Sequence, residues 1–328
     1  MKAKAYRGAP RWLVWTVGLA LLAGVVAIAV HFAEGGDFLR LALHARPGWL
    51  LAAAALQAGT YLAQAQVWRL VAGAAKARLS FADACRISVA KQFVDQALPS
   101  AGVSGTVFTA GALDARGMSR GAAWSAVAVN LISYDAVYIV GLAAAVSLGV
   151  LQGRGSGVIV FVAILFVMLS AGFTALMLFL PGRESHPLSR RIARVPMIHG
   201  IVQHLESASP RLVRNPALLG LAMLWQAAIF ALDTLTLAAL IRSLAADARL
   251  AGAFVSFMIS SLVRSTGFVP GGLGTFEASS VFTLHLTGVR LPVALAATLM
   301  FRGLTFWLPM LPGLWYSRRL ARAVDIRR

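Results

Sequence analysis

The chain has 328 residues, of which 59% are hydrophobic and 13% charged, and its mean hydropathy is +0.76. This composition excludes an ordinary soluble domain and predicts an integral membrane protein. The net charge of +18 does not indicate a nucleic-acid partner, because the basic residues gather between apolar runs and no aromatic side chains alternate with them.

The cysteine and histidine content argues against a metal site. The single cysteine, Cys85, excludes an internal disulfide and a cysteine metal cluster. The six histidines are scattered without the spacing of metal ligands. We therefore expect no metal and no cofactor.

Two apolar runs open the chain. Residues 12–32 carry no acidic or basic side chain except His31 and are long enough, at about 1.5 Å per residue, to cross about 30 Å of hydrocarbon. We expect them to form a retained first span, because they exceed a typical signal-peptide core. In a second span over 49–72, Gln57, Tyr61 and Gln64 share one helix face turned away from lipid. Helix packing and ligand contact would both explain that face.

Residues 84–112 contain no clean apolar run of twenty residues and are interrupted by the small-residue segment 98–106. A re-entrant hairpin, which enters and leaves on one side of the membrane, fits this length better than a full span. Lys91 and Asp95 lie four residues apart, so they could neutralise each other on one helix. A structural and a functional role both remain open for this pair.

Two further spans are expected in the middle of the chain. The span over 122–151 contains Asn130, Tyr134 and Asp135, and the next, over 158–180, is uncharged. An acidic residue at membrane depth is a functional candidate by default, although it can also simply face a cavity.

The segment 182–215 holds six arginines, with apolar residues at roughly helical spacing. We expect this basic segment to lie along a membrane surface. A fifth span follows over 217–241 and contains Gln226 and Asp233.

The stretch 264–277 is the most heavily interrupted apolar part of the chain. Its Val-Pro-Gly-Gly segment lacks one amide donor and permits positive φ twice, so one helix should end near Phe268 and another begin near Leu273. A bilayer tolerates such a break only where the freed backbone groups face protein or water. The resulting hairpin over 253–285 is a candidate site, although a kinked helix without a ligand would also explain it.

The distribution of basic residues predicts an orientation. With the amino terminus in the cytoplasm, the segments on that side collect 19 Lys and Arg residues and those on the other side collect 6. The last span, 292–316, then carries Arg302 at depth and leads to a cytoplasmic tail. We expect six spans and two re-entrant hairpins in an all-α, multi-pass protein of the bacterial inner membrane, with both termini cytoplasmic.

The two breaks occupy matching places in the chain. Pro99 and Pro270 are 171 residues apart, as are Gly117 and Gly288. Span, hairpin and span thus occur twice, in opposite orientations under this topology. The two units are 48–151 and 216–317, linked by the span 158–180 and the basic segment. An inverted repeat predicts a transporter whose site lies near the midplane, where the halves meet.

The glycine-rich Pro-Gly-Gly-x-Gly-x-x-Glu motif at 270–277, followed by Phe-Arg-Gly-Leu-Thr-Phe-Trp-Leu-Pro at 301–309, resembles the membrane domain of the lysylphosphatidylglycerol synthase and flippase family. The likeness covers about 12–316 and is strongest in the second half. It implies a stand-alone membrane form that moves lipid without attaching lysine to it, because no soluble synthase domain is present.

The first break is more similar to the branch of this family associated with hopanoid biosynthesis. The family often has an acidic–arginine pair in the third span, where this chain has Asn130 and Leu131. That departure leaves the head group of the substrate open.

The second hairpin has the chemistry of an anion site. The amides after the break start a helix, where partial positive charge gathers, and Arg264 and Arg302 add full charges. Glu277 could pair with Arg302 in the empty site, or it could carry a proton. A permanent ion pair of Glu277 that only joins helices is the alternative. The candidate residues for substrate binding or transport are Lys91, Asp95, Pro99, Ser100, Gly102, Ser104, Asp135, Asp233, Arg264, Pro270, Gly271, Gly272, Gly274, Glu277 and Arg302.

Three functions are compatible with these features. The first is a lipid flippase or transporter that moves a phospholipid or hopanoid-type lipid. The second is an integral membrane enzyme acting on lipid, which is weakened because the sequence shows no Ser-His-Asp arrangement and no metal spacing. The third is a scaffold that recruits lipid-biosynthesis proteins through 182–215, but a scaffold needs no broken helices at membrane depth.

Overall fold

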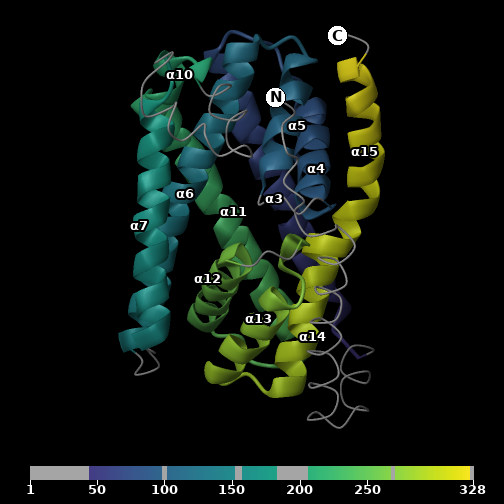
Figure 1. The fold of residues 1–328 in the computed structure, drawn as a ribbon. Coiled ribbons are helices and arrows are strands. Elements are labelled where there is room, and N and C mark those ends of the chain that lie inside the picture. Colours follow the sequence, from purple (N-terminus) through teal and green to yellow (C-terminus); the bar gives the residue numbers. More distant parts are fainter. Residues whose placement is uncertain (1–43, 98–101, 152–156, 183–205, 267–269, 326–328) are drawn as a thin grey trace, which may run out of the picture.

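A computed structural model describes residues 44–97, 102–151, 157–182, 206–266 and 270–325 (Figure 1). These residues form an elongated bundle of helices without a strand, which confirms the predicted all-α class. The predicted first span, most of the basic segment, Pro99 and Ser100 lie outside the described residues.

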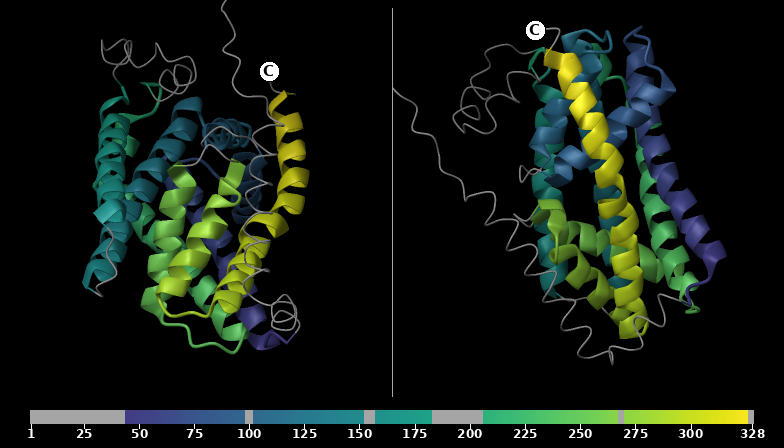
Figure 2. Two further views of the ribbon diagram at one scale, coloured as in Figure 1. Left: turned by 60° about the horizontal axis from the view of Figure 1, so that its bottom comes forward. Right: turned by 90° about the vertical axis from the view of Figure 1, so that its right-hand side faces the viewer.

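Long helices form the frame of the bundle (Figures 1 and 2). They are α3 (Pro47–Ala74), α6 (Arg120–Leu151), α7 (Gly157–Phe179) and α11 (Pro216–Ser243). In the described part of the chain, four segments are long and apolar enough to cross a membrane: Arg120–Leu151, Val160–Phe179, Pro216–Ser243 and Leu291–Arg319. Helix α3 has 28 residues, or about 42 Å at 1.5 Å per residue, but it carries several polar side chains. The total of six spans stays a prediction.

Two helical hairpins fill the interior of this frame. The first consists of α4 (Phe81–Ala97) and α5 (Val103–Asp114), and the second of α12 (Leu250–Thr266) and α13 (Thr275–Leu286). A helix of 12 residues, such as α5 or α13, is about 18 Å long and cannot cross about 30 Å of hydrocarbon. Figure 1 shows α4 and α5 in the upper half of the bundle and α12 and α13 in the lower half. The two hairpins therefore lie at opposite ends of the bundle.

Corresponding helices of the two halves have equal lengths. Helices α3 and α11 have 28 residues each, α4 and α12 have 17 each, and α5 and α13 have 12 each. Helices α3 and α11 both have a proline in their first turn. The turns correspond as well, because Lys76 and Ala245 both have φ +56°, and Gly117 and Gly288 have φ +91° and +97°.

The last helical segment changes its winding in the middle. Helix α14 (Leu291–Arg302) leads into a π-helical turn (Gly303–Trp307) and then α15 (Leu308–Asp325). Pro309 has no N–H group, so the carbonyl of Thr305 lacks its usual donor four residues later. The Gln96 side chain on α4 supplies a donor instead, from Nε2 at 3.1 Å. This bond joins the first hairpin to the end of the second half.

Helices α3 and α11 pack side by side along their length (Figure 2, right). Gly59 permits the approach, since a Cβ atom at this position would lie 3.3 Å from Leu232 Cδ1. In lipid there is no hydrophobic driving force between helices, so such close packing has to hold them together.

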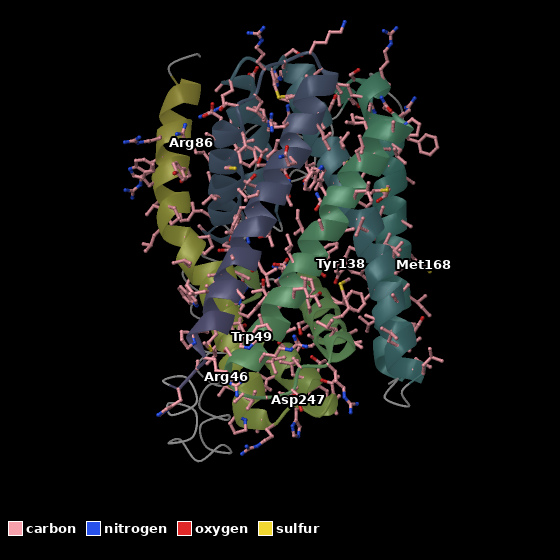
Figure 3. All side chains as sticks on the ribbon, turned by 180° about the vertical axis from the view of Figure 1, so that it is seen from behind. Arg46, Trp49, Arg86, Tyr138, Met168 and Asp247 are labelled. Carbon is pink, nitrogen blue, oxygen red and sulfur yellow. The ribbon has the colours of Figure 1, made fainter. Side chains whose placement is uncertain are left out.

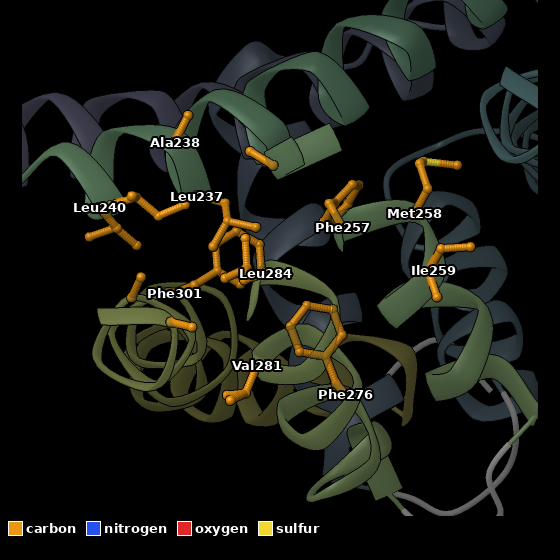
Figure 4. Close-up of a cluster of buried hydrophobic side chains, with 14 of the residues drawn as sticks. Leu237, Ala238, Leu240, Phe257, Met258, Ile259, Phe276, Val281, Leu284 and Phe301 are labelled. Carbon is orange, nitrogen blue, oxygen red and sulfur yellow. The ribbon is translucent and has the colours of Figure 1, made fainter. Parts of the chain in front are cut away.

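The lower half has an aromatic and aliphatic core between α11, α12, α13 and α14 (Figure 4). Phe276 and Phe301 stack with ring centroids 5.7 Å apart, and Phe257 meets Phe301 edge to face at 6.1 Å. Helix α7 lies at the edge of the bundle and exposes large apolar side chains such as Met168 (Figure 3). Its outer face has the composition expected of a surface in contact with lipid.

Candidate functional site

The second break is a tightly packed turn. Pro270–Gly272 forms a short 3-10 segment in which Gly271 and Gly272 have φ of +59° and +65°. A Cβ atom on Gly271 would collide with the Phe306 ring, and one on Gly272 would collide with the Arg264 side chain. Glycine is required at both positions for its conformation and for its small size.

The start of α13 is closed by its own residues. The backbone N–H of Gly274 donates to Glu277 Oε2 at 2.7 Å, and the Thr275 hydroxyl donates to the Gly272 carbonyl at 3.0 Å. This is the arrangement of a capping box, in which an acidic side chain in the first turn reaches back to the amide before the helix. One oxygen of Glu277 is therefore already used by the fold.

Arg302 contacts the same turn with two of its guanidinium nitrogens. Its Nε donates to Glu277 Oε1 at 2.7 Å, and its Nη2 donates to the Gly271 carbonyl at 2.8 Å. Its guanidinium also lies over Phe306 and Phe276, 4.5 and 5.3 Å from the ring centroids. The side chains of Arg302 and Glu277 are 3% and 1% exposed. The geometry favours a permanent pair that stabilises the hairpin over a head-group contact.

Arg264 is in a different situation. It is half-buried near the end of α12, and among the described residues it has no ion-pair partner within 4 Å. Ser260 and Ser261, on the preceding turn, are buried with hydroxyl groups that have no hydrogen-bond partner within the described part of the chain. The donors of this guanidinium are therefore available to a ligand.

Asp233 lies in the same region, on α11. The Gln57 side chain on α3 neighbours its carboxylate, and the charge of Arg264 on the adjacent helix α12 acts on it. The negative charge of Asp233 also acts on Tyr61 of α3 and on Tyr134 of α6. We call Gln57, Tyr61, Tyr134, Asp233 and Arg264 the polar cluster. It brings together residues of four helices.

In the first hairpin, Lys91 Nζ and Asp95 Oδ2 form an ion pair at 2.5 Å, four residues apart on α4. Both side chains are about one-fifth exposed, at 22% and 20%. The carboxylate lies against Gly105 of α5, where a Cβ atom would collide with it. The charge of Lys91 also reaches Tyr134, so this pair borders the polar cluster.

The remaining predicted residues lie elsewhere. Asp135 accepts a hydrogen bond from Thr174 on α7, so it joins α6 to the outer helix, and its charge also acts on the adjacent Tyr134. Gly102 has φ +83° just before α5, and Ser104 lies in the first turn of that helix. The charges of Arg264, Asp233, Lys91 and Asp135 thus all act on Tyr134, while Asp135 is in addition bonded to α7.

Two features have no counterpart among the predicted site residues. The first is a set of amides between α3, α6 and α11, where Gln64 Nε2 and Gln226 Nε2 donate to Asn130 Oδ1 at 2.8 and 3.0 Å. The second is the bond from Gln96 to Thr305. Pro309 signals an unpaired carbonyl at Thr305, but only the fold shows which side chain reaches it.

A shallow hollow of about 310 Å³ lies at the lower end of the bundle. It is lined by Arg46, Gly48, Trp49 and Ala52 (Figure 3). None of these is a predicted site residue, so this hollow is separate from the polar cluster.

A comparison with known families gives one match. The family described as the lysylphosphatidylglycerol synthase TM region matches residues 15–313. No curated protein matches the chain. The matched range contains both hairpins, the polar cluster and Arg302.

Proposed function

We propose that this chain, which belongs to the family of the lysylphosphatidylglycerol synthase TM region, is a flippase that moves a lipid with an anionic, phosphate-containing head group across the membrane. The family places the chain among membrane proteins connected with lipid. The observation that carries the proposal is Arg264, which lies against Gly272 in the turn of the second hairpin and has no ion-pair partner among the described residues.

The two halves support an inverted repeat. Each contains a long helix, a hairpin of 17 and 12 residues, and a further long helical segment, in the same order. Helix α4 contacts the turn Pro270–Gly272, so the end of one hairpin meets the tip of the other. Discontinuous helices that meet at the interface of inverted repeats are typical of substrate sites in transporters.

The accessibility of the polar cluster supports a lipid substrate. Tyr61, Tyr134, Asp233 and Arg264 are partly exposed, as is Lys91 at the border of the cluster. The helices around them expose apolar side chains on their outer faces. A head group can then enter the polar region while the acyl chains, which lose about 0.8 kcal/mol per CH₂ on transfer to water, stay in lipid.

In this proposal Arg264 binds the phosphate, because a guanidinium matches phosphate oxygens with two parallel N–H donors. Arg302 and Glu277 hold the second hairpin in shape. The basic residues at the upper end, among them Arg86 in Figure 3, support an orientation in which that end lies in the cytoplasm of a bacterial inner membrane.

The test is transport of a fluorescent phosphatidylglycerol in proteoliposomes, measured as the accessibility of its head group to a membrane-impermeant quencher. Arg264→Gln should abolish transport, whereas Arg249→Gln, an exposed arginine before α12, should leave it unchanged. Full transport by Arg264→Gln would refute the assignment. Equal transport of a hopanoid-type lipid with a neutral head group would refute the anionic substrate class.

A further inference from the structure

The last helical segment of the chain packs into two separate hydrophobic clusters. Before the π-helical turn, α14 contributes Ala296 and Phe301 to the lower core, together with α11, α12 and α13. After the turn, Tyr316 of α15 packs against an upper cluster formed mainly by α3, α4, α5 and α6. Figure 1 shows α14 in the lower half of the bundle and α15 in the upper half. The turn Gly303–Trp307 therefore joins the two halves.

The part below the turn is held together by buried hydroxyl groups. Ser256 Oγ of α12 donates to the Ser280 carbonyl of α13 at 3.2 Å, and Thr283 Oγ1 of α13 lies 2.8 Å from Ser256 Oγ. The hydroxyl groups of Ser280 and Thr298, on α13 and α14, are 2.9 Å apart. All four side chains are buried. These bonds join α12, α13 and α14, which we call the lower unit.

The part above the turn is fixed to the first hairpin. Gly313 of α15 lies so close to α4 that a Cβ atom at this position would be 2.4 Å from Phe93 Cβ and 2.9 Å from the Val89 carbonyl oxygen. Such close packing holds helices together in lipid, where burial of apolar surface between helices supplies no hydrophobic driving force. Helix α5 packs against both α4 and α15. We call α4, α5 and α15 the upper unit.

The turn between the two units has the features of a hinge. The N–H group of Leu308 donates to the carbonyl of Gly303, five residues earlier, which is the wide bond of a π-helix. Pro309 supplies no N–H group to continue the helical ladder. A Cβ atom on Gly303 would meet no other atom within 4 Å, so packing does not require glycine there. Because glycine is a poor helix former, it makes this turn easier to deform.

A single side-chain bond links the upper unit to the hinge. Gln96, in the last turn of α4, is 5% exposed and donates from Nε2 to the Thr305 carbonyl at 3.1 Å. The other oxygen of this amide, Oε1, has no hydrogen-bond partner among the residues that the structure describes. Arg302, at the lower edge of the turn, is bonded within the second half instead. The bond of Gln96 can therefore break without disrupting a larger network.

We propose that the turn Gly303–Trp307 is a hinge about which the upper unit moves against the lower unit, and that Gln96 is the latch of this hinge. While the bond is made, the Thr305 carbonyl has a donor and the units keep the arrangement of this structure. When the bond breaks, the carbonyl needs another donor, which lipid cannot supply and water can. Release of the latch and entry of water between the units therefore go together.

This movement would act on the candidate site. The end of α4 contacts the turn Pro270–Gly272, and Gly272 lies against the side chain of Arg264. Movement of α4 away from this turn uncovers the region of Arg264, whereas the lower unit keeps its shape. The inference concerns motion within the chain and does not depend on which substrate the chain moves.

Hydrogen–deuterium exchange of the protein in detergent micelles tests the latch, because exchange also reports open states that are rarely populated. Gln96→Leu should raise the exchange rate of the amides in 303–311 about three- to tenfold, as expected for the loss of one hydrogen bond, and leave the amides of α13 unchanged. Gln92→Leu, one turn earlier on α4, is the matched control and should leave the hinge unchanged. Unchanged exchange of the hinge in Gln96→Leu, or an equal rise in α13, would overturn the latch.

Two further variants separate a hinge from a general loss of stability. Gly303→Ala, whose Cβ atom fits the open space, should slow exchange of the same amides about fivefold, because alanine favours the helix. In a Pro309→Ala background, the new backbone N–H group can bond to Thr305, so adding Gln96→Leu should no longer raise the exchange rate. Exchange at the wild-type rate in Gly303→Ala would refute the hinge.

Spin labels attached in a Cys85→Ser background test whether the units move as bodies. The label pairs occupy exposed positions: Ala82 with Arg318 in the upper unit, Ala251 with Phe282 in the lower unit, and Phe282 with Arg318 between the units. We expect Gln96→Leu to broaden the distribution of distances only for the pair between the units. Broadening within either unit, or a wild-type distribution between them, would overturn the proposal.

Discussion

The two hairpins have equal lengths but stabilise their charges in different ways. The first keeps Lys91 and Asp95 four residues apart on one helix, where both are about one-fifth exposed. The second shares Glu277 and Arg302 between α13 and α14, where both are almost completely buried. A local pair survives movement of its helix, whereas a pair between elements fixes them relative to each other. The first hairpin is therefore suited to movement and the second to rigidity.

The same comparison explains which cation is available. Asp95 and Arg264 are both the fifteenth residue of their helices, α4 and α12. Asp95 finds Lys91 on its own helix, but the residue at the place of Lys91 in α12 is Ser260. Arg264 consequently has no acidic partner on its own helix, so a ligand can bind it without displacing an adjacent carboxylate.

The largest expected effect concerns the buried pair. Glu277→Gln should lower the free energy of unfolding by about 3–5 kcal/mol, because it leaves Arg302 charged and unpaired in the interior. The double variant Glu277→Gln/Arg302→Gln should be milder, since no lone charge remains. Thermal and chemical unfolding in detergent micelles would measure both. A double variant less stable than the single one would contradict a purely stabilising pair.

The next effect compares the two tips. Gly271→Ala should cost about 2–4 kcal/mol, because it combines a left-handed backbone with a collision against Phe306. Gly102→Ala should cost only about 1–2 kcal/mol, because its φ is also positive but a Cβ atom there would find space. The midpoints of unfolding of the two variants decide this. Equal losses would show that the two tips are packed alike.

An intermediate effect is expected when the hydrogen bond from Gln96 to the Thr305 carbonyl, which joins the two halves, is removed. Gln96→Leu should cost about 1–3 kcal/mol, because it leaves the Thr305 carbonyl without a donor. In a Pro309→Ala background the backbone N–H of residue 309 can supply that donor, so the same change should cost much less. The four proteins form a double-mutant cycle read by thermal unfolding. Equal costs in both backgrounds would mean that the proline does not create the need for Gln96.

A smaller effect is expected for the local pair of the first hairpin. Lys91→Gln should change stability by less than about 1 kcal/mol, as is usual for an accessible pair four residues apart. The free energies of unfolding of Lys91→Gln and Glu277→Gln, measured under the same conditions, give the comparison. A loss as large as that of Glu277→Gln would remove the distinction between the two hairpins.

The smallest expected effect concerns Asp83, in the first turn of α4 at the start of the first hairpin and outside the spanning helices. Partial burial raises the pKa of the Asp83 carboxyl, but hydrogen bonds from Ser80 and Arg116 and the charge of Arg116 outweigh it, so the net pKa is lowered. Ionised Asp83 therefore contributes to the free energy of unfolding at pH values above 3.8, its usual pKa. This contribution is lost as the pH falls through the lower pKa of Asp83 in the folded protein. Unfolding between pH 6 and about pH 3 should show a slightly weaker loss for Asp83→Asn than for the wild type. Identical profiles would mean that the network around Asp83 contributes nothing.

The sequence predicted the breaks because proline and glycine act locally. The Val-Pro-Gly-Gly segment and the small residues after Ala97 interrupt helices whatever surrounds them. The partners of buried charges depend on the whole fold. Nothing in the local sequence shows that Arg302 is held by Glu277, the Gly271 carbonyl and two phenylalanine rings.

Two acidic residues that look equivalent in the sequence also differ in their partners once the chain is folded. Asp135 and Asp233 both stood in apolar spans without a visible partner. In the fold, the Thr174 hydroxyl of α7 donates to Asp135, whereas Asp233 lies beside Gln57 and is acted on by the charge of Arg264. These contacts join residues far apart in the chain, so spacing within one helix could not distinguish the two carboxylates.

The π-helical turn at Gly303–Trp307 also sets the phase of the last helix. An α-helix advances about 100° per residue, so a turn that holds one residue more rotates everything after it by about that angle. Helix α14 can then present one stripe to α11 and α13, while α15 presents another to α4, where Gly313 lies against Phe93. Deleting one residue from the turn would rotate that glycine out of register with Phe93, and a single continuous helix could no longer serve both halves of the molecule.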